Sequence, residues 1–355
     1  MSMHYAQACD KHVPEREAIL LVRLDGVGDA ALCIPALEGL RRAFPEATFG
    51  AVCSNANATL FSARVEHIHI YRSGQPVGSL GGELAAVGYQ KALVATEEVA
   101  GYELARASGA KERAGFWHRL YKPFKSLWQR TQVTRPVYRP AARGAAPEHE
   151  VETLYRLAVA LGARAPAPSA PEALRPWLRV ESTEDARAVA GCVGVQITPK
   201  WLSSGYTPSA VAGVLSEMFA ELGDNRGALI AASADEDLAS AILEQLAPSL
   251  RTQIRLLASL PLPSWLGAID ALDVLVTPDT GAAHVAGMLG RCVVDIFDPQ
   301  DYERLSAQWR PWAGSWRCHA KRHLDMDWDA AAYGRFLAAQ ARELRAMDTP
   351  ERRLG

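Results

Sequence analysis

Short apolar runs alternate along the chain with segments whose apolar residues recur at helical spacing. Residues 19–24 are apolar apart from one arginine, as expected of a parallel strand buried on both faces. A turn with Gly26 and Gly28 follows, and residues 30–44 then show a helical pattern that is closed by a proline. The beginning of the pattern therefore predicts a strand, a glycine turn and a helix.

The same alternation continues through both halves of the chain. Further strands are predicted at 48–53, 67–71 and 92–95 in the first half, and at 193–197, 228–232, 274–277 and 293–297 in the second. Further helices are predicted at 150–161, 208–222, 236–246, 262–271, 282–289 and 330–347. Strands that alternate with helices are typical of a doubly wound parallel sheet, which binds ligands beyond the carboxyl ends of its strands.

A change of composition divides the two halves. Residues 163–176 contain four prolines and read as a linker, and 355 residues exceed the usual size of one domain. We predict an N-terminal domain at 1–168, a C-terminal domain at 169–328, and a final helix within 329–355 that is expected to pack back on the N-terminal domain.

Charge and targeting signals narrow the class of protein. The chain has 38 basic and 40 acidic residues, so no global field attracts nucleic acid or an anionic membrane, and any such attraction is local. The six cysteines are scattered without a C-x-x-C pair, which favours a reducing compartment. Residues 1–16 are polar, and no apolar run reaches the roughly 20 residues that span a bilayer. We expect a cytoplasmic protein that does not bind nucleic acid.

The first glycine turn is followed by an acid, in the order Asp25, Gly26, Val27, Gly28 and Asp29. A carboxylate at this place stabilises a helix start by about 1 kcal/mol, and this structural role is the favoured one if the motif is taken alone. In the functional alternative, Asp29 lies above a ligand at the strand end. The single G-x-G lacks the third glycine of the dinucleotide fingerprint.

A second polar cluster follows the predicted strand at 274–277. Thr280 and Gly281 begin a helix and offer a hydroxyl and free N–H groups to phosphate oxygens. Asp279 is suited to accepting hydrogen bonds from sugar hydroxyls, and His284 lies one turn later on the side of Thr280. The alternative is a cap and an interior histidine, but a cap needs only one polar residue.

A third feature is the basic and aromatic segment 111–143, which contains Glu112 as its single acid. Its cations and rings suit an anionic glycan or amphiphilic acceptor, because rings stack on sugars and cations meet phosphate or carboxylate. The same mixture suits single-stranded nucleic acid, and a basic helix face with core aromatic residues is the structural alternative.

The first two motifs together resemble glycosyltransferase family 9, the heptosyltransferases. The strand and turn up to Gly28 and Asp29, followed by Pro35-Ala36-Leu37 and Leu40 to Pro45, are similar to the opening of that family. The segment from Asp279-Thr280-Gly281 and His284 to Phe297-Asp298-Pro299 is similar to its nucleotide-sugar motif. The two motifs occur in the family's order and cover both predicted domains.

The resemblance implies an α/β GT-B architecture, with two Rossmann-like doubly wound parallel-sheet domains that face a cleft. It implies an inverting, metal-independent transfer of heptose or a related sugar from a nucleotide diphosphate, in the family ADP-heptose, to a lipopolysaccharide-core or other surface glycan. The donor is a substrate, and no cofactor is implied. Carried over by position, Asp29 is the base, Asp279, Thr280, Gly281 and His284 bind the donor, and Gly28, Arg113, Arg119 and Lys122 lie at the acceptor side. An anionic glycolipid acceptor would bring peripheral contact with the cytoplasmic face of the inner membrane.

The sequence also departs from the family. A lysine that family members carry before an aromatic-proline helix start is absent from residues 203–208, and Lys200 is either its substitute or an ordinary solvated lysine. A D-x-D spacing occurs at Asp325 to Asp327, where a helix start explains it better than a metal site. Two alternative functions stay open, namely a nucleotide-sugar or glycan-binding protein with little catalysis and a GT-B nucleotide-sugar epimerase.

Overall fold

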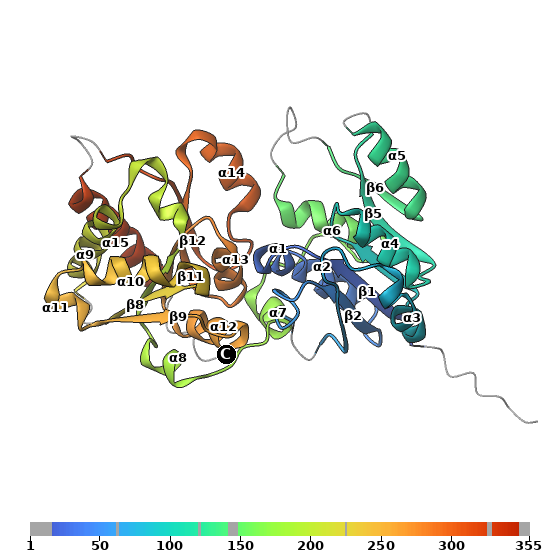
Figure 1. Ribbon diagram of the computed structural model, residues 1–355, viewed down its shortest axis with the longest axis horizontal. Helices are drawn as coiled ribbons and strands as arrows, with labels where there is room; N and C mark the ends of the chain where they lie inside the picture. The colour runs from blue at the N-terminus through green and yellow to red at the C-terminus, as the bar shows by residue number, and fades with distance from the viewer. Residues whose placement is uncertain are drawn as a thin grey trace, which may run out of the picture.

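The computed structural model of the chain describes residues 16–61, 64–119, 122–140, 148–223, 226–324 and 329–347. Two α/β domains lie side by side, and helices α1 and α13 meet where they adjoin (Figure 1). Each domain contains one six-stranded sheet whose paired strands are all parallel. The prediction of two doubly wound parallel sheets is confirmed.

The N-terminal sheet has the strand order β3-β2-β1-β4-β5-β6. Its strands are β1 Ala18–Arg23, β2 Thr48–Cys53, β3 His67–Ile70, β4 Lys91–Val94, β5 Glu112–Trp117 and β6 Arg135–Tyr138. The chain order reverses between β1 and β4, so the cleft beyond their carboxyl ends is the expected ligand site. Strand β1 is buried along its whole length, which explains its continuous apolar run.

The C-terminal sheet repeats this topology in the order β12-β11-β10-β7-β8-β9. Its strands are β7 Val193–Ile197, β8 Gly227–Ala231, β9 Ile254–Ala258, β10 Val274–Pro278, β11 Cys292–Phe297 and β12 Trp316–Ala320. The order reverses between β7 and β10, and the segment Asp279-Thr280-Gly281 follows β10 directly. Both switch points therefore lie at the ends of strands that carry the predicted motifs.

Helices cover both faces of each sheet. In the N-terminal half these are α1 Val27–Ala31, α2 Ile34–Ala43, α3 Gly78–Val87, α4 Val99–Ala107, α5 Pro123–Gln132 and α6 Glu150–Ala160. In the connection and the C-terminal half these are α7 Pro171–Leu174, α8 Glu184–Ala188, α9 Pro208–Leu222, α10 Glu236–Glu244, α11 Pro248–Arg251, α12 Leu262–Ala271, α13 Gly281–Met288, α14 Tyr302–Trp309 and α15 Ala330–Met347. Short 3-10 helices are η2 Arg175–Trp177, η3 Pro199–Gly205, η4 Ser233–Asp235 and η5 Pro299–Asp301.

One apolar cluster extends through both domains. It includes Ile19 of β1 and Leu275 of β10, and it reaches the connecting segment at Trp177. The indole of Trp177 is fully buried, packs edge-on against Phe49 and donates a hydrogen bond to the Glu38 carboxylate at 2.9 Å. Burial of this shared apolar surface favours a fixed arrangement of the two domains.

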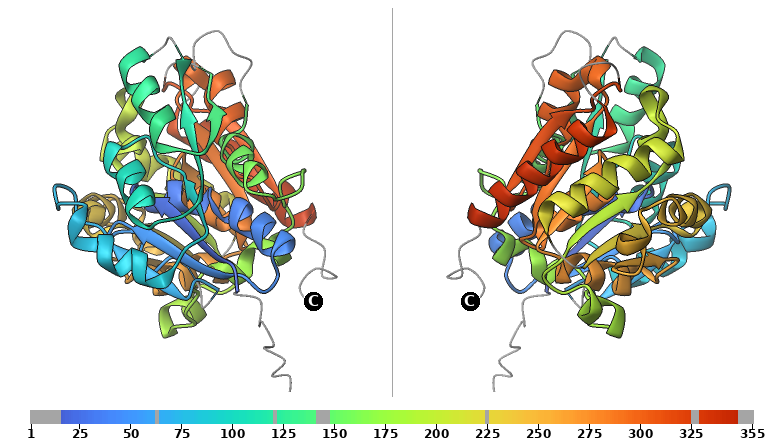
Figure 2. Two further views of the ribbon diagram at one scale, coloured as in Figure 1. Left: turned by 90° about the vertical axis from the view of Figure 1, so that its right-hand side faces the viewer. Right: turned by 90° about the vertical axis from the view of Figure 1, so that its left-hand side faces the viewer.

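The final helix corrects one expectation. Helix α15 lies along α9 and against β11, so it packs on the C-terminal domain and not on the N-terminal one (Figure 2). Its buried residues Tyr333, Leu337, Ala341 and Leu344 join the apolar cluster of the C-terminal sheet, because they fall on one face at helical spacing. The domain boundary near residue 168 stays a proposal.

Among the described residues, none of the helices combines the length and the hydrophobicity that are needed to cross a membrane.

Candidate functional site at the domain interface

The two predicted motifs meet through a contact between glycines. A Cβ atom added to Gly28 would lie 2.6 Å from the Cα atom of Gly281 and 3.8 Å from the His284 ring. A Cβ atom added to Gly281 would lie 2.8 Å from Gly28. Only residues without a side chain allow the backbones of α1 and α13 to come this close. The contact brings Asp29, the residue after Gly28, beside the first turn of α13.

The start of α13 has no side-chain cap. Thr280 occupies the N-cap position, but its side chain does not cap the helix, and its Oγ1 atom lies 2.9 Å from the Thr277 hydroxyl. The N–H groups of the first turn are therefore not satisfied by a side-chain cap, and the helix dipole adds partial positive charge there. This helix start can accept a phosphate group, as predicted, and the simple capping role is not the one observed.

Lys200 lies at this helix start as well. Its ammonium group donates to the backbone carbonyl of Asp279 and lies 3.2 Å from the Asp279 carboxylate. The lysine comes from the 3-10 segment η3 after β7, whose first residues are capped by the Thr198 hydroxyl. The Lys200 side chain is 56% exposed, so it can still reach a bound anion. Of the two interpretations of Lys200, the structure favours the site residue over the solvated lysine.

His284 is buried and uncharged. Burial is the main reason that its pKa falls to about 3, and electrostatic interactions with His149 and Lys200 lower it further. A neutral imidazole can donate one hydrogen bond, but it cannot neutralise a diphosphate. Lys200 and the helix dipole are therefore the positive groups at the α13 start, and a role for His284 in donor binding stays a prediction.

Asp29 forms an ion pair with a buried arginine. Its Oδ1 atom lies 2.8 Å from Arg23 Nη2, while Arg23 Nε lies 2.9 Å from Asp25 Oδ2. The guanidinium also donates to the Ala95 carbonyl, and it is 6% exposed, which fixes its position. The Asp29 side chain keeps 39% exposure. The carboxylate is therefore oriented by Arg23 but stays partly exposed.

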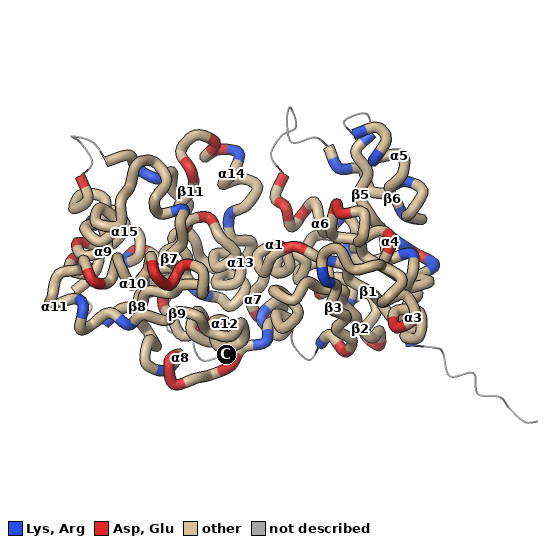
Figure 3. The backbone as a smooth tube through the Cα atoms, in the orientation of Figure 1, with Lys and Arg blue, Asp and Glu red and all other residues tan. Residues whose placement is uncertain are grey.

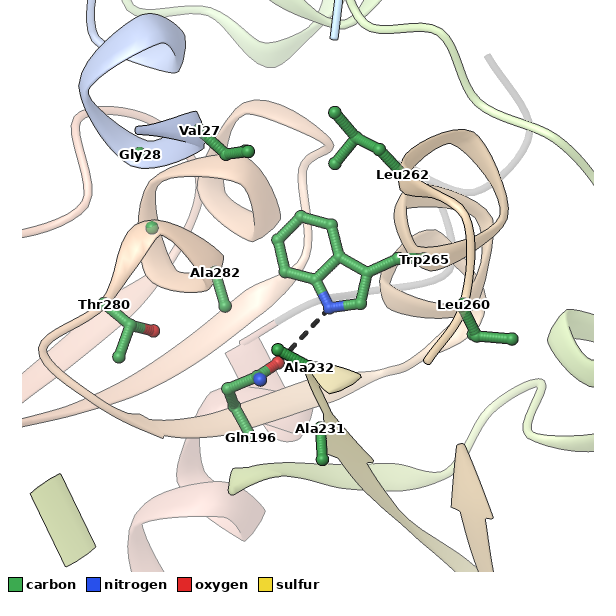
Figure 4. Close-up of a pocket in the computed structure, with 11 residues that line it drawn as sticks. Val27, Gly28, Gln196, Ala231, Ala232, Leu260, Leu262, Trp265, Thr280 and Ala282 are labelled. Atoms are coloured by element: carbon green, nitrogen blue, oxygen red, sulfur yellow. Dashed lines mark hydrogen bonds between the residues drawn. The ribbon is translucent and has the colours of Figure 1, made fainter. Parts of the chain in front are cut away.

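An apolar cavity of about 370 Å³ lies between the two motifs (Figure 4). The Trp265 indole forms one wall, and its Nε1 atom donates to the Gln196 side chain at 3.4 Å. The cavity is lined by Val27, Gly28, Gln196, Ala231, Ala232, Leu260, Leu262, Trp265, Thr280, Gly281 and Ala282. A flat aromatic wall next to a phosphate-binding helix start suits a nucleotide. The sequence pattern does not indicate a role for Trp265, because the residue lies on a separate helix with no motif around it.

A charged cluster missed by the sequence analysis lies at the carboxyl edge of the N-terminal sheet. Glu97, just after β4, contacts His118 at 3.2 Å, Lys122 at 3.2 Å and Arg139 at 3.7 Å. The hydrogen bond from His118 is the main reason that the pKa of Glu97 falls to about 2. The predicted residue Lys122 is thus part of this edge, whereas Glu97 had no sequence signal because its partners follow other strands.

The other two predicted acceptor residues have different positions. Arg119 has a left-handed backbone, with φ of 54°, and its guanidinium lies 4.4 Å from the Tyr138 ring and 5.5 Å from the Trp117 ring. Arg113 lies near the amino end of β5, and its guanidinium donates to the carbonyls of Gln132 and Ala110. Because the amino end of a parallel strand is opposite the ligand edge, this placement removes Arg113 from the acceptor set.

A histidine from the N-terminal half connects the domains above this edge. His149 Nδ1 accepts a hydrogen bond from the Val151 N–H, and Nε2 donates to the Arg310 carbonyl at 2.8 Å. Its ring also packs against Trp312 at a centroid distance of 4.8 Å. Burial lowers the pKa of His149 to about 4, so the ring is neutral and bridges α6 to the segment after α14.

Comparison with known proteins identifies the family that this chain resembles. Residues 216–326, which include the α13 start, match the family model of glycosyltransferase family 9 (heptosyltransferase). The resemblance to glycosyltransferase family 9 is confirmed. No curated protein matches the sequence.

Solved structures share the fold over more than 90% of this chain. A family 9 glycosyltransferase from Veillonella parvula is 15% identical, with a TM-score of 0.71 over 94% of this chain and 98% of that one. The E. coli ADP-heptose lps heptosyltransferase II is 17% identical, with a TM-score of 0.71 over 92% and 99%. The E. coli heptosyltransferase WaaC with ADP is 17% identical, with a TM-score of 0.69 over 91% and 99%. At these identities the likeness shows the fold, which is the two-domain GT-B architecture. The D-x-D spacing at Asp325 to Asp327 lies outside the described residues.

Proposed function

We propose that the chain is a family 9 glycosyltransferase that transfers heptose or a related sugar from a nucleotide diphosphate to an anionic surface glycan. The observation that carries this proposal is the backbone contact of Gly28 with Gly281, which sets an accessible carboxylate beside a phosphate-binding helix start. Neither helix start has a side-chain cap, and a capping role would not explain why the two motifs meet. The family match over 216–326 supports a donor site in the C-terminal domain.

In the proposed binding mode, the donor extends from the cavity to the start of α13. The nucleobase stacks on Trp265, and the diphosphate receives hydrogen bonds from the first turn of α13 and from Lys200. Solved relatives carry ADP and ADP-2-deoxy-2-fluoro heptose. We therefore propose ADP-heptose as the donor, with Asp279 and His284 beside its sugar.

Asp29 is the proposed general base. An acceptor hydroxyl transfers its proton to the Asp29 carboxylate as its oxygen attacks the anomeric carbon of the donor sugar. The bond from that carbon to the diphosphate breaks at the same time, and the bonding electrons leave with the phosphate oxygen. Attack from the face opposite the diphosphate inverts the anomeric centre, and no covalent intermediate forms on the protein. Lys200 and the α13 start stabilise the negative charge that develops on the diphosphate.

The acceptor side is proposed along the carboxyl edge of the N-terminal sheet. Glu97, Lys122 and Arg119 lie there, and the neighbouring helix α5 carries Lys125 and Arg130 without any acidic residue (Figure 3). Two apolar side chains of α5, Phe124 and Leu127, are 90% and 69% exposed. Cations next to exposed apolar groups suit a glycolipid acceptor that lies in an anionic membrane surface. Peripheral contact at the cytoplasmic face of the inner membrane is part of this proposal.

The test compares two carboxylates that share one arginine. Asp29→Asn removes the base, whereas Asp25→Asn removes the other partner of Arg23 and serves as the matched control. We expect the Asp29 variant to lose at least 100-fold in turnover of ADP-heptose with a core-oligosaccharide acceptor, because general base catalysis contributes about 10² to 10⁴. Its ADP affinity should stay within about twofold of the parent.

Full turnover by Asp29→Asn, or an equal loss in the Asp25 control, would contradict the assigned role. Binding of ADP-heptose without product for any acceptor would instead support the binding-protein alternative. Conversion of the donor sugar without an acceptor would point to an epimerase.

A further inference from the structure

A buried lysine lies behind the loop that carries Lys200. Lys321 follows β12 and is 4% exposed. Its ammonium group donates to the carbonyls of Lys200 at 3.1 Å, Trp201 at 2.5 Å and Ser203 at 2.7 Å, and it lies 3.2 Å from the Ser203 hydroxyl. The ring of Tyr206 covers it at 4.3 Å. No other described lysine satisfies three carbonyls of one loop.

The η3 loop has a shape that requires such a donor. Three of its carbonyl oxygens converge on one point, and a buried carbonyl without a partner costs about as much as a lost hydrogen bond. Ser204 and Gly205 have φ angles of 62° and 81°, so the chain turns back on itself there. The Lys321 ammonium therefore holds the loop in a conformation that its own backbone does not satisfy.

This loop is also the place where the family lysine is absent. Residues 203–208 contain no lysine, but the cation of Lys321 lies against Ser203 and Tyr206 within that stretch. Lys321 and Lys200 line one cavity of about 320 Å³ together with Asp279 and Asp298. Burial lowers the pKa of Lys321 to about 8, and the charge of Asp298 opposes that decrease.

We infer that Lys321 is a positioning residue of the donor site: it fixes the η3 loop through three carbonyls so that Lys200 reaches the donor diphosphate. Lys321 acts through Lys200, because its own hydrogen bonds are directed to the loop. The inference rests on the proposed function and adds to it a residue that no motif predicts.

The test is a double-mutant cycle on ADP affinity, measured by calorimetry. Lys200→Met should weaken ADP binding about tenfold, the loss of one charge-assisted hydrogen bond. Lys321→Met should weaken it by a similar factor, and the double variant should be no more than about twofold weaker than Lys200→Met alone, because the second lysine is then already out of place. Lys91→Met is the matched control, since Lys91 is also a buried lysine but pairs with Glu17 and Glu112 at the other domain's sheet. It should keep parental ADP affinity.

Independent losses that multiply to about 100-fold, or parental ADP affinity in Lys321→Met, would overturn the inference while the proposed function stands. Failure of the unchanged protein to bind either ADP or UDP would overturn both. If thermal unfolding shows that Lys321→Met is not folded, Lys321→Gln enters the same cycle, because its amide keeps two of the donors. If its amide preserves the loop, Lys321→Gln should bind ADP more tightly than Lys200→Met does. In the cycle with Lys321→Gln, a double variant whose loss of ADP affinity equals the product of the two single losses would count against the inference.

Discussion

The contact between Gly28 and Gly281 allows a sharp test of the interface. Gly28→Ala would place a methyl group 2.6 Å from the Gly281 Cα atom, whereas ordinary contacts of this kind begin at 3.4 Å. Backbone cannot rotate away as a flexible side chain can, so α1 and α13 must separate by about 1 Å. Gly26→Ala is the matched control, because nothing lies within 4 Å of a Cβ atom at that position.

The expected cost falls mainly on catalysis. Overpacking of this kind typically lowers the free energy of unfolding by about 1–3 kcal/mol. A displacement of about 1 Å between reacting groups can lower turnover by about 100-fold, since Asp29 moves with Gly28 and the donor moves with Gly281. Gly26→Ala should lower the free energy of unfolding by roughly 0.5–1 kcal/mol, because alanine is a poorer N-cap residue than glycine.

The measurements are the rate of nucleotide diphosphate release with donor and acceptor, and urea unfolding of the same samples. Turnover of Gly28→Ala within about threefold of Gly26→Ala, with both variants folded, would refute the claim that this contact sets the catalytic geometry. An equal loss in both variants would show that the glycine turn itself matters, and not the approach of the two helices.

Three further predictions concern the same interface. The free energy of unfolding should fall by about 2 kcal/mol for each of His149 and His284 as the pH drops from 6.5 to 5. The two histidines have pKa values of about 4 and about 3 in the folded protein, so they bind protons in this range only when the chain is unfolded. His149→Gln should remove its share of this pH dependence in urea unfolding. Trp265→Ala should weaken ADP binding by roughly 10- to 100-fold in calorimetry, the usual worth of stacking on one base. A chelator should leave turnover unchanged, because the α13 start and Lys200 supply the positive groups, and a loss restored by a divalent cation would contradict this.

The strands that the sequence predicts are mostly those in the middle of the sheets. The range 193–197 matches β7 in full, and the predicted helix 262–271 matches α12. The strands that the pattern did not reveal are β5, β6, β9 and β12, of which three are sheet edges and one is next to an edge. Each of them contains an arginine, and β6 and β12 have no buried residue at all. Edge strands need no continuous apolar run, so hydrophobicity does not identify them.

The residues of the candidate site also fall into those that the sequence could indicate and those that it could not. Asp29 and Thr280 could be predicted because each follows a buried strand and a glycine lies beside it, so local chemistry marks both positions. Trp265, Glu97 and Lys321 could not, because each acquires its role from residues that are distant in sequence. Glu97 contacts His118 and Arg139, which follow two other strands, and Lys321 contacts a loop about 120 positions earlier in the chain. Such proximity is fixed by the fold and leaves no local pattern.

In the proposed mechanism, the arrangement around Arg23 lets an ion-paired carboxylate serve as the base. A buried cation that loses its only partner is strongly destabilising, by about 3–5 kcal/mol. Arg23 has two partners, since Asp25 and Asp29 bind different nitrogens of one guanidinium. When Asp29 takes up the acceptor proton and becomes neutral, Asp25 still compensates the buried charge, so the proton transfer does not leave an unpaired cation inside the protein. In this proposal Asp25 holds Arg23 and never receives the proton, so Asp25→Asn should cost clearly less turnover than Asp29→Asn.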